Sequence, residues 1–333
     1  MFERKYVFKP VEESCLSVVV RLAVDEYYAE QKNVSALYDK DYSPEIKNSI
    51  NELFHNGKGL MIYENDVPVG FIGLFIDDKD TEGYKTAHSP IYGYGIKKGT
   101  NRGIIASLLF QYISEMLLQT NVRHYAIKLY AHDKEVITTF VLNQFGILCT
   151  DTIRNIDVPF ITEKVDGFAF KEFSKRDIQE HKGTLLRIWR DLANHLRKSP
   201  TYYYGTEFTD DTYWEYVNDN NTRLFAAMDD AQQIIGLIDA SRYGNCFANS
   251  DVVTVNVGDL YVDRAYRGRR IAQGLLQYVS DILMEDNYKR LWVEHGTTNP
   301  NALRFWDKYF TRFTYTLTRS IDRKIVDLRG ETV

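Results

Sequence analysis

Hydrophobic and polar positions follow two different periods along residues 166–333, and these periods occur in a clear order. Alternation with a period of two predicts strands, because successive strand side chains point to opposite faces. The expected strands are 170–173, 224–228, 232–240, 253–262, 290–295 and 313–321. Apolar residues three and four positions apart predict helices over 177–196, 271–284 and 299–310. A meander of strands followed by one strand–helix–strand unit is typical of an α+β fold.

The N-terminal half shows the same order of signals, which indicates a duplication. Its expected elements are 5–11, 60–63, 69–76, 92–96, 104–119, 125–130 and 136–144. Asp133 aligns with Asn299, and Phe140 with Trp306, at an offset of 166 residues (299 − 133). Further matches at nearly this offset join 69–70 with 235–236, 108–109 with 275–276, and 154–157 with 319–322. We therefore predict two domains, 1–160 and 166–333, connected by a linker near 157–167.

Composition narrows the classes of protein to consider. A chain of 333 residues with 44% hydrophobic and 26% charged residues is typical of two ordinary globular domains. Its net charge of −5 argues against a general nucleic-acid binder, which needs clustered positive charge. Residues 1–5 are charged and no apolar run approaches ~20 residues, so we expect a cytoplasmic protein without a membrane segment. The three cysteines form no CxxC pair, so we expect neither a metal site nor a redox site.

The sharpest local signal is a strand, a tight turn and a helix over residues 259–276. Where a helix begins after such a turn, backbone N–H groups and the positive end of the helix dipole converge on one point. That geometry binds a phosphate or pyrophosphate. The turn contains Gly268 and the four arginines Arg264, Arg267, Arg269 and Arg270, which suit a ligand with several phosphates. The alternative is a solvated basic helix start.

Two segments carry a resemblance to a known family. Residues 267–272, Arg-Gly-Arg-Arg-Ile-Ala, resemble motif A of the GNAT superfamily of N-acetyltransferases, whose pattern is Arg/Gln-x-x-Gly-x-Gly/Ala. Residues 299–308, Asn-x-x-Ala-x-x-Phe-Trp-x-Lys, resemble motif B of the same family. Arg270 occupies the usual glycine of motif A. We expect Arg270 to hold helical angles there, and its Cβ to narrow the approach of a diphosphate.

The resemblance covers nearly all of residues 166–322 and implies two tandem GNAT-like domains. Each would be a mixed, mostly antiparallel twisted sheet flanked by helices. It also implies that acetyl-CoA lies between two splayed parallel strands, 259–262 and 291–295, with a backbone N–H near Tyr261 or Val262 polarising the thioester carbonyl. The residues expected to bind the cofactor are Leu260, Tyr261, Val262, Arg267, Gly268, Arg269, Arg270, Ile271, Ala272, Gln273 and Asn299.

Acetyl transfer to an amine needs a group that takes up the ammonium proton. Glu294 is the first candidate, since it precedes Asn299 by five residues, where a branch of the family carries its general base. Asp259 lies on the facing strand and is the second, acting through water. The alternative is that both are ordinary surface or turn acids. Alternation places His295 on the face of Leu291 and Val293, which favours a packed histidine.

The group that reprotonates the leaving thiolate is less clear from the sequence. Trp306 stands where the family has a tyrosine, and an indole N–H does not deliver a proton. Tyr309, one helical turn farther on, or Tyr315 could replace it, although either tyrosine could instead serve packing. A thiolate with a pKa near ~8.5 could also leave without an acid.

The first copy lacks most of these features. Its motif A counterpart, 100–105, keeps Gly103 but has no arginine at the first position. Lys128 stands opposite Glu294, and Phe140 replaces the phenol. We therefore expect this half to be catalytically silent, although Gly103 leaves some cofactor binding conceivable.

The segment 195–221 is expected to cover the acceptor side of the active site. Its aromatic and acidic residues suit a cationic, partly apolar amine, although an amphipathic helix with a solvated acidic face explains them as well. These residues are Tyr202, Tyr203, Tyr204, Glu207, Phe208, Asp210, Asp211, Tyr213, Trp214, Glu215 and Tyr216. The predicted function is acetyl-CoA-dependent N-acetyl transfer to a primary amine of a small molecule or peptide. The alternative is a catalytically degenerate acyl-CoA-binding sensor or scaffold.

Overall fold

The computed structural model describes residues 5–77, 84–161, 163, 165–203, 205, 209–322, 324 and 325. By contacts, the chain divides into two compact units. Unit 1 comprises Met1–Thr150 and Arg312–Val333, and unit 2 comprises Asp151–Thr311. Each unit is a mixed, mostly antiparallel sheet flanked by helices, which confirms the predicted fold class.

Unit 1 is built on a sheet with the strand order β1-β2-β3-β4-β6-β14-β7, with β5 paired to β3. Its strands are β1 (Tyr6–Pro10), β2 (Lys58–Glu64), β3 (Val67–Asp77), β4 (Lys85–Ser89), β5 (Tyr94–Ile96), β6 (Val122–Tyr130), β7 (Gly146–Asn155, which continues into unit 2) and β14 (Thr314–Ser320). Its helices are the short η1 (Glu13–Cys15), α1 (Leu16–Gln31), α2 (Ser43–Asn56), α3 (Arg102–Leu118) and α4 (Lys134–Leu142). The pair β4–β6 is parallel, and the other pairs in this unit are antiparallel.

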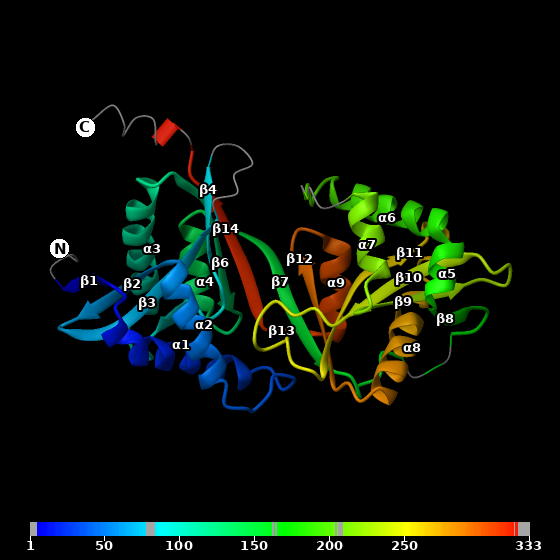
Figure 1. Ribbon diagram of the computed structural model, residues 1–333, viewed down its shortest axis with the longest axis horizontal. Coiled ribbons are helices and arrows are strands. Elements are labelled where there is room, and N and C mark those ends of the chain that lie inside the picture. Colours follow the sequence, from blue (N-terminus) through cyan, green and yellow to red (C-terminus); the bar gives the residue numbers. More distant parts are fainter. Residues whose placement is uncertain are drawn as a thin grey trace. The chain divides into compact units, whose positions relative to one another are not determined.

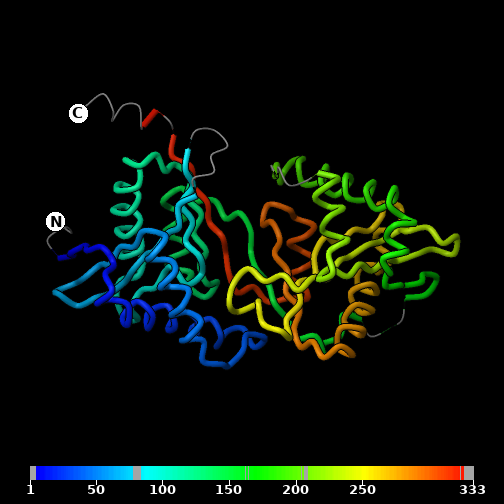
Figure 2. Tube along the Cα trace, in the orientation of Figure 1, coloured from blue at the N-terminus to red at the C-terminus, as the bar shows by residue number. Residues whose placement is uncertain are grey.

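Helices cover both faces of this sheet. Leu60 and Ile62 of β2 are buried in a core with residues of α3 and α4. Helices α1 and α2 also contact the sheet, outside this core. Helices α1 and α2 precede the second strand and were not among the expected elements. The order of the helices α1 to α4 along the chain, from blue to green, can be followed in Figures 1 and 2.

Unit 2 repeats this plan with the strand order β7-β12-β11-β10-β9-β8. Its strands are β8 (Ala169–Phe173), β9 (Thr222–Met228), β10 (Ile234–Ser241), β11 (Thr254–Val262) and β12 (Arg290–Gly296), and β13 (Thr311–Arg312) lies at the boundary of the two units. Its helices are α5 (Lys175–Glu180), α6 (Lys182–Leu196), α7 (Asp210–Asn218), the short η2 (Arg264–Tyr266), α8 (Ile271–Glu285) and α9 (Pro300–Tyr309). The expected helix over 177–196 is thus two helices, broken at His181.

Alternation along β9 shows how the two layers of unit 2 are filled. Phe225 and Ala227 are buried against α8 and α9, whereas Leu224 and Ala226 are buried against α5, α6 and α7. Figure 1 shows α8 on one side of the sheet and α6 and α7 on the other. The strands of unit 2 therefore lie between two helical layers.

The last strand of the second repeat lies in unit 1, and the last strand of the first repeat continues from unit 1 into unit 2. Strand β14, from the end of the chain, pairs with β6 and with the first part of β7 inside unit 1. The later part of β7 belongs to unit 2, where Ile156 N–H donates to Lys289 O at 2.9 Å. The contact units therefore differ from the ranges 1–160 and 166–333 expected from the duplication. The repeat gives the order of elements, but it does not show which copy of an edge strand pairs with which sheet.

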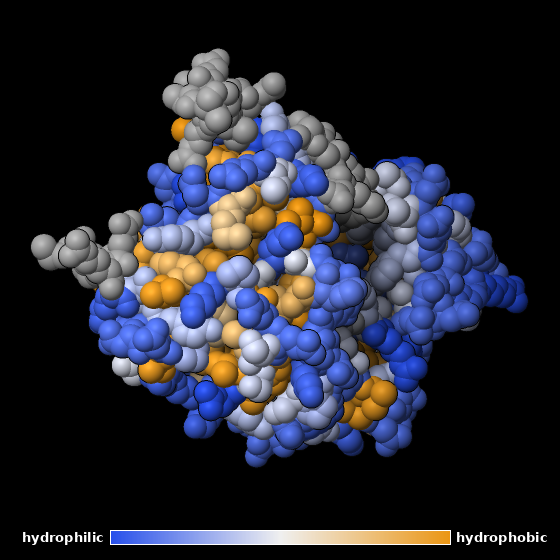
Figure 3. Space-filling model, turned by 60° about the vertical axis from the view of Figure 1, so that its left-hand side comes forward, coloured by the Kyte–Doolittle hydropathy of each residue, from blue (hydrophilic) through white to orange (hydrophobic). Residues whose placement is uncertain are grey.

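The sequence predicts a protein without a membrane segment. Among the described residues, no helix is long and apolar enough to cross a membrane. Figure 3 shows one face of the molecule, where hydrophobic residues reach the surface in several patches separated by hydrophilic ones.

Candidate functional site

Strands β11 and β12 open a gap in the sheet of unit 2. They pair in parallel only from Thr254 to Asn256, opposite Arg290 to Trp292. Beyond these positions the ladder ends, although both strands continue, to Val262 and Gly296. The splayed parallel strands expected from the resemblance are therefore present.

A β-bulge in β11 lies beside this gap. Strand β10 pairs Leu237 with Tyr261, but Asp239 with Gly258, so β11 carries an extra residue between the two pairs. Asp259, within the bulge, has a φ of 42°, which is rare for a residue with a Cβ. Bulges redirect side chains at sheet openings, and this one places Asp259 at the cavity.

The start of α8 has the geometry of an anion site. Gly268 has a φ of 84°, and the first intrahelical bond runs from Gly274 N–H to Arg270 O at 2.9 Å. The N–H groups of Ile271, Ala272 and Gln273 precede that bond. Arg270 is the N-cap with φ 61° and ψ 14°, so the expectation of helical angles is wrong. It is left-handed because the chain must reverse sharply between the turn and the helix, which is why glycine suits this position.

The four arginines of the turn do not form one cluster. Arg267 lines the cavity, and its Nε donates to Val262 O at 3.0 Å, which directs the side chain along the end of β11. Arg269 lies over the ring of Tyr266, and Arg270 makes an exposed ion pair with Glu163. Arg269 and Arg270 both line a separate, open depression.

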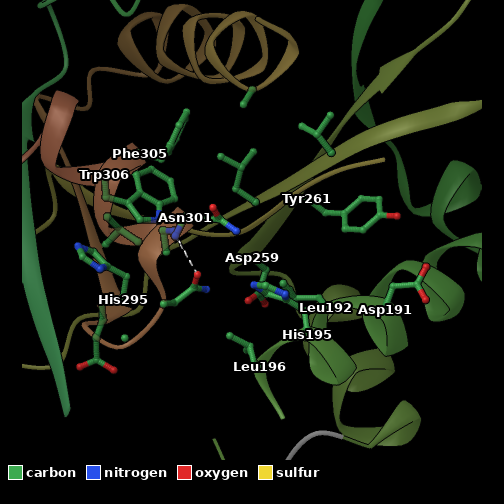
Figure 4. A pocket seen from close by; sticks show the side chains of 18 of the residues that line it. Asp191, Leu192, His195, Leu196, Asp259, Tyr261, His295, Asn301, Phe305 and Trp306 are labelled. Carbon is green, nitrogen blue, oxygen red and sulfur yellow. Dashed lines mark hydrogen bonds between the residues drawn. The ribbon is translucent and has the colours of Figure 1, made fainter. Parts of the chain in front are cut away.

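A cavity of about 480 Å³ fills the gap between β11, β12 and the neighbouring helices. Figure 4 shows Phe305 and Trp306 of α9 on one side, His195 and Leu196 of α6 on the other, and Asp259 between them. Its lining residues are Asp191, Leu192, His195, Leu196, Asp259, Leu260, Tyr261, Val262, Arg267, Ala272, Val293, Glu294, His295, Gly296, Asn299, Asn301, Ala302, Phe305 and Trp306.

Eight of the predicted site residues meet at this cavity, and the others do not line it. The eight are Asp259, Leu260, Tyr261, Val262, Arg267, Ala272, Glu294 and Asn299. The predicted residues outside its lining are Gly268, Arg269, Arg270, Ile271, Gln273 and Tyr309. All of these except Tyr309 belong to the turn and the first residues of α8.

Asn299 has a clear local role. It is the N-cap of α9, and its side-chain oxygen accepts from the N–H groups of Asn301 at 3.2 Å and Ala302 at 3.3 Å. The dashed line in Figure 4 marks the bond with Asn301. Asn299 is also buried, so the side chain that was expected to hold the cofactor or a water stabilises the start of a helix.

The two candidate bases have different surroundings. The Glu294 carboxylate is exposed and accepts a long hydrogen bond of 3.4 Å from Asn245 Nδ2, which also donates to Asp151. The Asp259 side chain is accessible through the cavity. The walls of the cavity desolvate its carboxylate, and the charge of Asp239 repels it, so the pKa of Asp259 is raised. This environment suits a group that takes up a proton near neutral pH.

The candidate acids lie away from this cavity. Tyr309 packs its ring against Phe160 and Phe305, with centroids 5.4 Å apart in each pair. Tyr315 belongs to unit 1, where its hydroxyl accepts from Arg312 Nη1 at 2.6 Å. Trp306 lines the cavity and is almost fully buried. Among the described residues that line the cavity, the only phenol is that of Tyr261.

The segment 195–221 contributes less to the cavity than expected. Only His195 and Leu196 of this segment line it, while Tyr204, Glu207 and Phe208 lie outside the described residues. Tyr213 stacks on Trp189 in the core with centroids 4.4 Å apart. The aromatic residues described between 209 and 218 therefore belong mainly to the packing of α7.

The structure adds residues that the sequence did not single out. Asp191 and Leu192 lie one helical turn before His195 and Leu196, so a pair of i, i+4 positions presents one face of α6 to the cavity. That spacing was visible in the sequence. Asp239 is a buried acid that follows five residues without a polar side chain in β10, and Tyr216 donates a hydrogen bond to it. An acid among apolar strand residues was also a visible signal.

The corresponding turn in unit 1 is closed by its own side chains. Gly103 N–H donates to Glu135 Oε1 at 2.7 Å, and Ile104 N–H donates to Asn101 Oδ1 at 3.1 Å. Arg102 turns inward to ion pairs with Glu26 and Asp133. Gly103 is retained for packing, because a Cβ there would lie 2.8 Å from the Thr139 hydroxyl.

Metal binding has no visible basis in the part of the chain that the structure describes. No group of three or more His, Cys, Asp or Glu side chains is placed there to hold a metal ion.

Comparisons with known proteins agree with this architecture. The model of the Acetyltransferase (GNAT) family matches residues 189–310, which include the second half of α6, the bulge, the start of α8 and α9. No curated protein sequence matches the chain significantly.

Solved structures show the same fold over nearly the whole chain. A GCN5-related N-acetyltransferase from Sphaerobacter thermophilus is 11% identical with a TM-score of 0.58, and the match covers 95% of both chains. A tandem GNAT protein from the clavulanic acid biosynthesis pathway is 12% identical with a TM-score of 0.50, over 95% of this chain and 98% of that one. A glucosamine N-acetyltransferase region of a fungal multi-domain β-N-acetylglucosaminidase is 15% identical with a TM-score of 0.51, over 94% of this chain and 38% of that one.

These identities establish the fold, and the family match locates the better preserved copy. The chain therefore has a tandem GNAT fold, and its residues 189–310 match the model of the GNAT family of acetyltransferases.

Proposed function

We propose that unit 2 transfers an acetyl group from acetyl-CoA to a primary amine of a small molecule or peptide. One observation carries this proposal: three features of unit 2 lie together at the same place. These are the opening between β11 and β12, the bulge at Asp259 and the cavity that continues to Arg267. Together they offer one end for a phosphate group and another for a reacting amine.

The residues present fit acetyl-CoA. Arg267 and the first N–H groups of α8 would hold the diphosphate, since helix N-termini and arginines both favour negative charge. Leu260, Ala272 and Phe305 supply apolar walls for the arm that joins the diphosphate to the thioester. When bound, acetyl-CoA would supply the acetyl group in activated form.

The chain itself would handle the proton of the amine. Asp259 lies in the cavity with a raised pKa, so its carboxylate would take the proton from an ammonium group and leave the nitrogen lone pair free. Glu294 lines the same cavity and would help to attract a cationic acceptor. Tyr309 has no part in this scheme, because it does not line the cavity.

Calorimetry with acetyl-CoA tests the cofactor site. We expect one site per chain, with affinity lowered at least about tenfold in Arg267→Ala, because a charge-assisted contact to phosphate is lost. The matched control is Arg176→Ala, an arginine on α5 with a side chain that is 86% exposed. Equal affinity in both variants, or no binding at millimolar acetyl-CoA, would contradict the proposal.

Turnover separates an enzyme from a sensor or scaffold that only binds acyl-CoA. The replacement of the family's phenol by Trp306 is the observation that favours the sensor. Free thiol release from acetyl-CoA, screened against a panel of primary amines, identifies the enzyme. Tight binding with no amine-dependent thiol release would support the sensor.

A further inference from the structure

A buried carboxylate lies on the strand that pairs with β11 at the cavity. Asp239, on β10, is 2% exposed, and its Oδ2 accepts a hydrogen bond from the Tyr216 hydroxyl. Its Oδ1 is buried and has no hydrogen-bond partner among the described residues. A buried carboxylate with one acceptor atom unsatisfied is costly, because its lost hydration is only partly replaced.

The second carboxylate of this region belongs to Asp259. The register pairs Asp239 with Gly258, the residue before Asp259, and the bulge turns Asp259 toward the cavity. In the described part of the chain, neither Asp239 nor Asp259 forms an ion pair. A Cβ built on Gly258 would lie 3.8 Å from both carboxylate oxygens of Asp239, so the Asp239 carboxylate lies beside the residue that precedes Asp259.

Other charged or titratable groups surround the pair from each packed element. They are Tyr213 and Tyr216 on α7, Asp191 and His195 on α6, Glu294 and His295 on β12, and Arg267 before α8. Both tyrosines have raised pKa values, from burial first and then from the two carboxylates, so they remain neutral donors. Charges of the same sign in such a setting make it difficult to ionise both acids together.

We propose that Asp239 is a positioning residue for Asp259, whose carboxylate accepts a proton from the acceptor amine beside the buried Asp239 carboxylate. This inference rests on the proposed function. In the step, an N–H bond of the ammonium breaks and its electron pair stays on nitrogen. An O–H bond forms on Asp259, and the cation and the carboxylate both become neutral. Asp239 stays in place, held by Tyr216, and repels the ionised form of Asp259.

This arrangement also explains why a buried acid lacks a cation partner. The missing positive charge would be supplied by the ammonium of the acceptor, which enters the cavity beside Asp259. Arg267 lines the same cavity, but its side chain donates to Val262 O, whereas a lysine or arginine paired with Asp259 would hold Asp259 ionised.

Carboxyl titration by NMR tests the proposal on the intact protein without any substrate. With aspartate labelled at the carboxyl carbon, the signal lost in Asp259→Asn identifies Asp259, and the signal lost in Asp239→Asn identifies Asp239. We expect the midpoint of Asp259 to fall by at least about 1 pH unit in Asp239→Asn, since a neighbouring negative charge is removed. The matched control is Asp211→Asn, an exposed acid on α7, which should leave the midpoint unchanged.

Asp239 ionises first, while Asp259 is still neutral, so the midpoint of Asp239 should change little in Asp259→Asn. Asp239→Ser, a second neutral variant, keeps the proposal testable if Asp239→Asn does not fold. An unchanged Asp259 midpoint in a folded neutral variant of Asp239 would overturn the proposal. Acetyl-CoA binding is measured separately, so failure of the proposed function is distinguished from failure of this inference.

Discussion

At the scale of single residues, Arg270 is the clearest departure from the family motif. Its φ of 61° places it in the left-handed region, where glycine is favoured because it has no Cβ. The exposed ion pair with Glu163 contributes little, since solvent screens it. The backbone of motif A therefore keeps a conformation that favours glycine, although arginine occupies the position.

Replacing Arg270 with glycine or with alanine isolates the effect of its Cβ, because both variants remove the charge. Arg270→Gly relieves the left-handed strain, and we expect it to be about 1 kcal/mol more stable than Arg270→Ala. It should also bind acetyl-CoA more tightly than Arg270→Ala, because no Cβ faces the diphosphate. Thermal unfolding and calorimetry on both variants provide the measurements. Identical behaviour of the two would show that the Cβ has no influence.

Of the two candidate bases, Asp259 combines access to the cavity with a raised pKa. We expect Asp259→Asn to lower kcat about 10²-fold or more with little change in acetyl-CoA affinity, as the loss of a general base predicts. Glu294→Gln should have a smaller effect, mainly on the KM of the amine. Steady-state kinetics with an amine from the screen provides the measurement. A larger loss of kcat in Glu294→Gln would make Glu294 the base.

At the scale of elements, the starts of α3 and α8 show how two copies of one motif have diverged. At α8 the cap is a backbone conformation, and the side chain of Arg270 does not cap the helix. At α3 the N–H groups are satisfied by Asn101 and Glu135. A carboxylate therefore already occupies the anion position of α3.

Removing that carboxylate should affect stability but not cofactor binding. We expect Glu135→Ala to lower the free energy of unfolding of unit 1 by about 1–2 kcal/mol, because the Gly103 N–H loses its acceptor. Acetyl-CoA should still bind once per chain, since Arg102 stays committed to Glu26 and Asp133. Denaturant unfolding and calorimetry are compared with Glu52→Ala, an exposed glutamate on α2. Two acetyl-CoA sites in the wild-type protein would contradict the inference that side chains of unit 1 already occupy the anion position of α3.

At the scale of the whole molecule, the exchange of edge strands decides which contacts stabilise which unit. Leu317 belongs to the second sequence repeat, yet it is fully buried in the core of unit 1 and pairs with Ile127. Ile156 belongs to the first repeat, yet it lies in the core of unit 2. Each unit therefore depends on a segment from the far end of the other repeat.

Core substitutions in these segments should act across the repeats. We expect Leu317→Ala to cost about 2–5 kcal/mol and to reduce amide protection mainly in residues 5–149. Ile156→Ala should reduce protection mainly in residues 166–311. Hydrogen exchange followed by mass spectrometry locates the effect. A loss of protection in 166–311 with Leu317→Ala would contradict the exchange.

Much of the fold and part of the site could be predicted from the sequence, because both depend on local pattern. Periodicity located β9 to β12 and α8 and α9 to within a few residues, and the motif order identified the family. The same motifs placed Arg267, Ala272 and Asn299 at the correct elements, since a strand, a turn and a helix are set by adjacent residues.

Tertiary structure alone decided which residues come into contact across the sheet and between its layers. The left-handed Arg270, the bulge at Asp259 and the pairing of Asp239 with Gly258 depend on strand register, which residues far apart in the chain set together. Tyr309 lies outside the cavity lining because its ring packs on Phe160. Strand β14 belongs to unit 1 because its apolar face is buried there. Local sequence thus determined which elements form, whereas burial and register determined which side chains share the cavity.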